Sequence, residues 1–133
     1  MPQPMSKEEG RAGMLALRPE IPSIDPHLSS NPAEQFQNQT LRPVLKLQNP
    51  LLVAIFHHYL LQKGLDWAAM QAGARQDYIR QALQGDAALR NTLHGIVIGQ
   101  FSLDEWTQFA AQEKELRKRC TQMLIQRLQD QVG

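Results

Sequence analysis

The chain has 133 residues, 42% of them hydrophobic, which suits one globular domain with a real core and excludes a disordered chain or two full domains. Its 14 basic and 13 acidic residues leave a net charge of +1 with histidine neutral, so no large field attracts polyanions, which argues against a nucleic-acid partner. The single cysteine, Cys120, excludes an intrachain disulfide framework and a cysteine-based zinc cage, and is compatible with the cytoplasmic location that we expect.

The beginning of the chain is rich in proline, with six of the eight prolines at or before residue 32. Because proline fixes φ and lacks an N–H donor, this region is predicted to hold no regular helix or central strand. We expect residues 1–31 to form a flexible or extended arm, which can lie on the domain through Ile21, Ile24 and Leu28. Residues 32–133 are expected to form a single helical domain. The N-terminus also lacks the continuous apolar run of a secretory signal.

The first helical unit is predicted to start after Asn31. In the stretch NPAE, Asn31 can cap a helix that has proline at its first position and Glu34 at its third. Pro43 is expected to kink this helix or to begin a new one. We therefore predict one broken helical unit over residues 32–63, followed by Gly64 as the residue after the C-cap.

The stretch NPLLVAIFHHYLLQKG at residues 49–64 is the most apolar part of the chain. It is shorter than the roughly 20 apolar residues that span a bilayer, which excludes a membrane segment. Its composition predicts the central helix of a bundle, covered on most sides. His57 and His58 point about 100° apart on a helix and cannot readily bind one metal ion. We interpret one as interior and hydrogen-bonded and the other as marginal, and we expect no metal and no cofactor.

The rest of the chain is predicted to form three helices. Asp66 can cap the first, which runs to Gly85, and Asp86 can cap the second, which stops at Gly99. The third has the strongest start signal, because SLDE at residues 102–105 is a capping box. We therefore predict an all-α fold, a four- or five-helix bundle with an extended Pro-rich N-terminal arm.

Glu113 is the main candidate for chemistry. It lies between Phe109 and Leu116 on the predicted apolar face of the last helix, where a carboxylate needs a cation or hydrogen-bond donors. Such a group can be a structural ion pair or a general acid or base, and the structural interpretation is favoured. No residue is assigned as catalytic. The candidate ligand-lining residues are Arg42, Gln48, His58, Arg90, His94 and Glu113.

Small residues recur with four-three-four spacing in the helix that precedes Gly99. This ridge consists of Ala88, Thr92, Gly95 and Gly99. Small side chains let another backbone approach closely. The neighbour can be the 50–63 helix of the same chain or the same surface of a second subunit, and the first of these is favoured because helices joined by short loops pack on each other.

Two stretches, FQNQTLRPVLKLQNPLL (36–52) and LRNTLHGIVIGQFSLDEW (89–106), resemble a family of small bacterial proteins of unknown function. The resemblance covers most of residues 31–131 and implies a helical fold shared across bacteria. Some of these relatives carry a glyoxalase label. Known glyoxalases build their metal sites from β-rich modules or histidine clusters, and neither pattern occurs in this sequence. The resemblance therefore supplies no catalytic residues.

The sequence contains no serine elbow, phosphate-binding loop or dinucleotide fingerprint. We therefore expect a non-catalytic helical interaction module whose partner is a protein, most simply a second copy of itself in a homodimer. The alternative is a small enzyme or small-ligand binder that uses a polar cluster around Glu113 and His94. Neither nucleic acid nor a membrane is expected as a partner.

Overall fold

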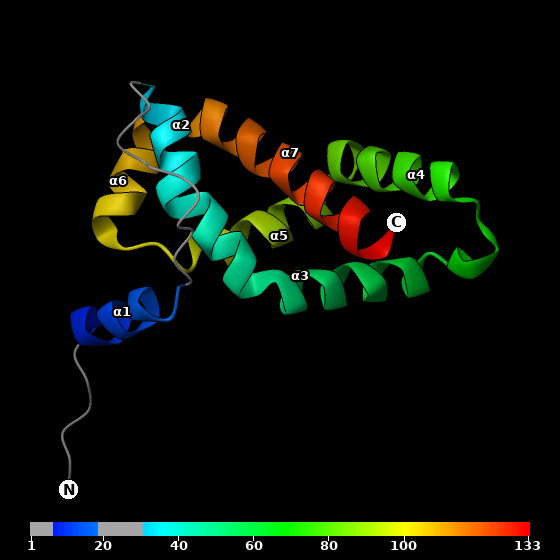
Figure 1. The fold of residues 1–133 in the computed structure, drawn as a ribbon, viewed down its shortest axis with the longest axis horizontal. Helices are drawn as coiled ribbons and strands as arrows, with labels where there is room; N and C mark the ends of the chain where they lie inside the picture. Colours follow the sequence, from blue (N-terminus) through cyan, green and yellow to red (C-terminus); the bar gives the residue numbers. More distant parts are fainter. Residues whose placement is uncertain (1–6, 19–30) are drawn as a thin grey trace, which may run out of the picture.

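The computed structural model describes residues 7–18 and 31–133, and every regular element in these ranges is a helix (Figure 1). The helices are α1 (Lys7–Ala16), α2 (Pro32–Phe36), α3 (Arg42–Gln62), α4 (Ala72–Gly85), α5 (Ala87–Ile98), α6 (Leu103–Ala111) and α7 (Glu113–Val132). A π-helical turn, Gln37–Leu41, joins α2 to α3, and a 3-10 turn, Trp67–Ala69, precedes α4. The predicted all-α fold is confirmed.

Helix α1 corrects the expectation that the Pro-rich arm holds no regular helix. No proline lies between Pro4 and Pro19, so nothing in this stretch interrupts the backbone hydrogen bonds of a helix. The helix is tied to the domain by Arg11, whose Nη1 donates a hydrogen bond of 2.6 Å to the carbonyl oxygen of Phe101. The three anchors that the sequence predicts in the arm lie outside the described residues: Ile21, Ile24 and Leu28.

The first helical unit has the predicted extent and an irregularity just before Pro43. At its start, the Asn31 side chain accepts hydrogen bonds from the backbone N–H groups of the first turn, as the sequence predicts. In the π turn, the N–H of Arg42 bonds to the carbonyl of Gln37, five residues back. This wider turn lets the chain pass Pro43, which has no N–H, without ending the helix. The unit ends before Gly64, whose φ of 68° is readily adopted by glycine.

Helix α3 buries one face and is not covered on most sides. The buried residues of its second half recur at i,i+4: Leu52, Phe56 and Leu60. On other faces, the side chains of Leu51 and Leu61 are 47% and 77% exposed. His57 and His58 are both exposed, so the prediction of an interior histidine was wrong. The reason is that α5 and α7 both pack on the core-facing side of α3, which leaves the other side to solvent.

The helix predicted from Asp66 to Gly85 is divided in two. Asp66 caps the 3-10 turn through its Oδ1, which accepts a hydrogen bond of 3.4 Å from the N–H of Ala69. The backbone is extended at Met70 and Gln71 before α4 begins. The next predicted cap is confirmed, since Asp86 Oδ1 accepts a hydrogen bond of 3.1 Å from the N–H of Leu89 at the start of α5.

The last predicted helix is also divided, and this break moves Glu113. The capping box of Ser102 and Glu105 starts α6 as predicted. Gln112, however, has φ −135° and ψ 37°, which is not helical, so α6 ends before it and α7 turns away (Figure 1). Phe109 and Leu116, buried on either side of Glu113, therefore belong to different helices. Glu113 becomes the exposed first residue of α7, and its expected place on the apolar face was wrong.

The core runs through the molecule from α2 and α6 to α4 and the 3-10 turn. At one end the rings of Phe36, Phe101 and Phe109 contact one another, with centroids 5.4, 5.5 and 6.1 Å apart. At the other end Trp67 contacts Phe56 and Tyr78, and its Nε1 donates a hydrogen bond of 3.0 Å to the carbonyl oxygen of Val132.

None of the helices in the described ranges is long and apolar enough to cross a bilayer.

Candidate functional site

The structure does not bring the six candidate ligand-lining residues together. Arg90 and His94, both on α5, line a hollow of about 680 Å³ against α7. Arg42 lines a different hollow beside α7, and His58 lines a third one between α3 and α5. Gln48 is half-buried on α3. Glu113 is exposed and reaches the first hollow only through its ion pair with Arg117. The predicted cluster thus reduces to Arg90 and His94, joined by residues that the sequence analysis left out.

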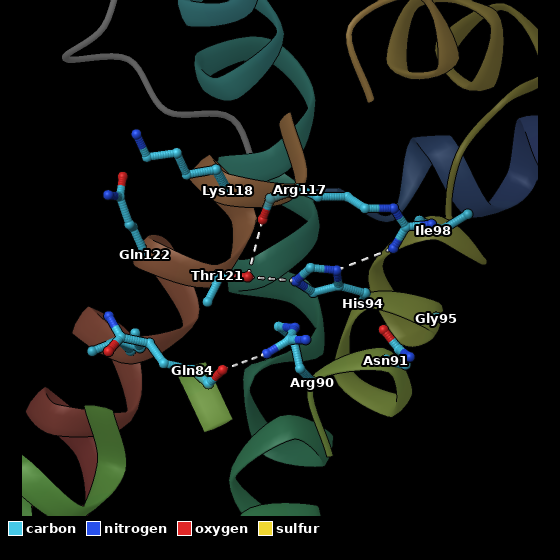
Figure 2. Close-up of a pocket in the computed structure, with 11 residues that line it drawn as sticks. Gln84, Arg90, Asn91, His94, Gly95, Ile98, Arg117, Lys118, Thr121 and Gln122 are labelled. Atoms are coloured by element: carbon cyan, nitrogen blue, oxygen red, sulfur yellow. Dashed lines mark hydrogen bonds between the residues drawn. The ribbon is translucent and has the colours of Figure 1, made fainter. Parts of the chain in front are cut away.

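His94 is 3% exposed and is held between two residues of α7 (Figure 2). Its Nε2 lies 2.9 Å from Oγ1 of Thr121, and its Nδ1 lies 3.2 Å from Nη1 of Arg117. A guanidinium group can only donate, so Nδ1 must accept and the imidazole proton resides on Nε2. The hydroxyl of Thr121 accepts that proton's hydrogen bond and donates its own, over 3.0 Å, to the carbonyl oxygen of Arg117.

The surroundings of His94 keep it neutral. Burial, reinforced by the positive charges of Arg117 and Arg90, lowers the pKa of His94 from 6.5 to about 4. At neutral pH the imidazole is therefore uncharged, and both of its nitrogens are engaged in hydrogen bonds. It is not free to act as a general base, and its role in the site is to orient Arg117.

The two arginines of the hollow are fixed in place. Arg117 donates from Nε to Glu113 over 2.9 Å and lies with its guanidinium carbon 5.6 Å from the centre of the Phe109 ring. Arg90 donates from Nη1 to the carbonyl oxygens of Leu83 and Gln84 at 3.1 and 2.7 Å, at the end of α4. Each guanidinium group has five N–H donors and uses only some of them in these protein hydrogen bonds. The remaining donors can bind a ligand.

The charge of this hollow has one sign. Among the described residues that line it are Arg90, Arg117 and Lys118, and no aspartate or glutamate. Lys118 lies at the rim, exposed, on the outer side of α7 (Figure 2). The neighbouring carboxylate of Glu113 offsets one of the three positive charges. Fixed cations beside a neutral imidazole suit the binding of an anion. Thr121 does not form a nucleophile–base pair with His94, because the imidazole Nε2–H donates to its hydroxyl.

Glu105, and not Glu113, is largely buried, with a side chain that is 15% exposed. Its two oxygens accept hydrogen bonds from Arg18 at 2.7 and 2.9 Å, from Oγ1 of Thr40 at 2.9 Å and from the N–H of Ser102 at 2.9 Å. Burial alone would raise the pKa of Glu105, but these hydrogen bonds outweigh it and lower the pKa. Because its oxygens are fully engaged, Glu105 is a structural group.

The sequence offered partial signals for the residues that were missed. The pairs Glu113–Arg117 and Glu115–Arg119 are present at 2.9 Å each, as the i,i+4 spacing predicts. The same spacing places Thr121 one turn after Arg117, where its hydroxyl donates to the carbonyl oxygen of Arg117. Only the packing of α5 against α7 shows that Arg117 also faces His94.

All four residues of the candidate interface ridge are exposed: Ala88, Thr92, Gly95 and Gly99. A Cβ placed on Gly95 would have no atom within 4 Å, and one on Gly99 would meet only carbonyl oxygens of its own helix. Within the described residues, no other backbone therefore closely approaches Gly95 or Gly99, although α5 as a whole packs on α3. Ala88 and Thr92 instead line a shallow hollow beside His58.

Side chains of His, Cys, Asp and Glu in the described ranges form no group of three or more that could hold a metal ion.

The chain matches no protein-family model, no curated protein and no solved structure. The resemblance to small bacterial helical proteins stays a prediction.

Proposed function

We propose that the protein binds a small anionic ligand in the hollow between α5 and α7. We call this the His94 hollow and define it by Arg90, His94, Arg117, Lys118 and Thr121. One observation carries the proposal: the lining residues supply three cations and no carboxylate, and two of the cations are guanidinium groups fixed by protein contacts.

The physical case rests on pre-organisation. A cation that is already oriented loses little conformational entropy when it binds an anion, so more of the interaction free energy appears as affinity. The planar guanidinium fork matches carboxylate and phosphate groups, which it can bind through two parallel hydrogen bonds. The volume of about 680 Å³ is within the usual range for small-molecule sites.

His94 has a positioning role in this proposal. Its neutral Nδ1 accepts from Arg117 without neutralising the guanidinium charge, which a carboxylate in the same place would do. Thr121 completes the arrangement by fixing the imidazole from the other side. A bound anion would favour protonation of the imidazole, so ligand binding is expected to raise the pKa of His94.

Isothermal titration calorimetry with acetate, citrate and inorganic phosphate tests the proposal. For the anion that binds best, Arg90→Gln is expected to weaken affinity by about tenfold, the value of one hydrogen bond to a charged group. Lys118→Gln, which changes only an exposed rim residue, is expected to weaken affinity by a smaller factor. Arg80→Gln removes an exposed arginine of α4 outside the hollow and should leave affinity unchanged. Equal affinity in all variants would contradict the proposal.

A second candidate is the helical interaction module, acting as a homodimer or with another protein. It is favoured by the exposed ridge on α5 and by Leu51 and Leu61, which are 47% and 77% exposed on α3. Sedimentation equilibrium of the wild type and of Thr92→Arg tests the homodimer, which requires that the wild type associate and that the added charge disrupt it. A reducing compartment such as the cytoplasm is part of either proposal, and the free, buried thiol of Cys120 is compatible with it.

A further inference from the structure

We propose a second anion site at Arg42, Arg119 and Arg127, which we call the arginine cluster, and we infer that its ligand carries a phosphate group. This site is separate from the His94 hollow, and the inference does not rest on the function proposed there. The cluster lines a hollow of about 450 Å³ formed by the π turn, the start of α3 and α7 from Arg119 onward.

The three guanidinium groups come from two directions. Arg119 and Arg127 are eight residues apart on α7, about two turns, so both project from the same side of that helix. Arg42 is the first residue of α3 and lines the same hollow from the facing element. The π turn contributes Gln37, whose Oε1 accepts a hydrogen bond of 2.8 Å from Arg119.

The hydrogen bonds of the arginine cluster are incomplete. The Nε of Arg42 is buried and has no acceptor, and no acceptor for the rest of its guanidinium lies among the described residues. Arg127 bonds to Oδ1 of Asn49 at the long distance of 3.4 Å. Arg119 is the better satisfied, because it also donates to Glu115 over 2.9 Å. A buried donor without an acceptor destabilises the folded protein, and a bound oxyanion would supply the missing acceptors.

The electrostatics of the cluster agree with this geometry. Burial lowers the pKa of Arg127, and the positive charge of Arg42 lowers it further, while Asp130 acts in the opposite direction. The lining residues comprise three arginines and one aspartate, so their charges sum to +2. Glu115, paired with Arg119 just outside the hollow, offsets one of these charges, and the remaining excess is positive, which favours an anionic ligand. Planar guanidinium groups are suited to the oxygens of a phosphate monoester.

The test uses inorganic phosphate as the probe and the arginine Nε–H resonances as reporters. Phosphate is expected to shift the signals of Arg42 and Arg127 in a saturable manner. Arg42→Gln is expected to weaken this binding by about tenfold, since it removes a charged hydrogen-bond donor. Asp130→Asn should tighten it about threefold by removing a competing carboxylate. Arg80→Gln is the matched control and should leave the affinity unchanged, and far-ultraviolet circular dichroism of each variant confirms folding.

The two proposed sites give different results in this experiment. Saturable shifts at Arg42 and Arg127 in the wild type, with a weaker affinity at Arg127 in Arg42→Gln, support the arginine cluster, whether or not the His94 hollow binds anything. Shifts confined to Arg90 and Arg117 would overturn the cluster and support the function proposed above. An absence of saturable shifts at Arg42, or an affinity unchanged in both Arg42→Gln and Asp130→Asn, would also overturn it.

A phosphate group can belong to a soluble metabolite or to a lipid headgroup. Glycerol 3-phosphate in solution and vesicles that contain phosphatidic acid present the same phosphomonoester in these two forms. Binding of either one that is weakened by Arg42→Gln supports the arginine cluster and identifies the source. Binding of both that is insensitive to Arg42→Gln would overturn it.

Discussion

Arg18 and Glu105, 87 positions apart in the chain, form a bidentate ion pair with distances of 2.7 and 2.9 Å. The two side chains are only 9% and 15% exposed. Arg18 also donates to the carbonyl oxygen of Gln100, and Glu105 also accepts from Thr40 in the π turn. One buried carboxylate thus connects the segment after α1, the start of α6 and the turn before α3.

Removal of Arg18 is expected to destabilise the protein. In Arg18→Ala, Glu105 keeps its bonds from Thr40 and Ser102 but loses its countercharge in a buried place, and we expect a loss of about 2 kcal/mol in the free energy of unfolding. Urea denaturation measures this change. Adding Glu105→Gln to the Arg18 variant should recover part of the loss, because no unpaired charge remains. Arg80→Ala, at an exposed ion pair, should change stability by less than about 0.5 kcal/mol.

The stability of the protein is expected to fall between about pH 6.5 and pH 4 because of His94. Its pKa is about 4 in the folded protein and 6.5 as the ordinary value, so the unfolded chain binds a proton in this interval and the folded protein does not. Acidification therefore favours unfolding, and the effect is complete below about pH 4. Allowing for solvent screening at the hollow, we expect a contribution of about 2 kcal/mol.

The measurement is the free energy of unfolding at several pH values for the wild type and His94→Gln. The variant should lose much of the slope between about pH 5 and 6.5, a range above that in which Glu105 titrates. His57→Gln, at an exposed histidine, serves as the control and should retain the slope. A slope that is the same in wild type and His94→Gln would refute the assignment.

Substitution to glutamine is expected to have a small effect on stability at Glu113 and a large one at Glu105. Glu113→Gln alters an exposed ion pair at the start of α7 and should change stability by less than about 0.5 kcal/mol. Glu105→Gln leaves the buried Arg18 without its countercharge and should cost about 2 kcal/mol or more. Thermal denaturation of the two variants compares them directly. A larger effect at Glu113 would mean that it, and not Glu105, is the buried carboxylate.

Cys120 is expected to be unreactive in the folded protein. Burial raises the pKa of its thiol to about 12, so the nucleophilic thiolate is scarce near pH 8. A thiol-specific chromogenic disulfide reagent should label the chain slowly without denaturant and rapidly in urea. Because labelling then requires opening of the core, Arg18→Ala is expected to accelerate it. Rapid labelling of folded wild type would show that the thiol is accessible.

Many of the helix starts and ends could be predicted from the sequence, because each depends on groups that are only a few residues apart. Asn31, Asp86 and the box of Ser102 and Glu105 cap helices as predicted, and Gly64 follows the end of α3. Each of these signals satisfies backbone groups within one turn of itself, so no distant part of the chain is needed to interpret it. The all-α class follows from these signals and from the helical spacing of apolar residues.

Where local signals conflicted with tertiary packing, the predictions were wrong. The apolar spacing across residues 106–128 reads as one helix, and nothing local marks the break at Gln112 that carries Glu113 to the surface. The apolar stretch of α3 likewise does not reveal that one side stays exposed, because that depends on how many other helices reach it.

The sequence by itself thus determined the class of fold, most helix ends and the i,i+4 ion pairs of α7. Only the tertiary structure decided which polar and charged side chains lie next to one another. His94 faces Arg117 and Thr121, Arg42 faces Arg119 and Arg127, and Arg18 binds Glu105, in each case across two packed elements. The physical reason is that a helix fixes the direction of each side chain relative to its neighbours in sequence, whereas the choice of partner depends on which faces of two helices are buried together.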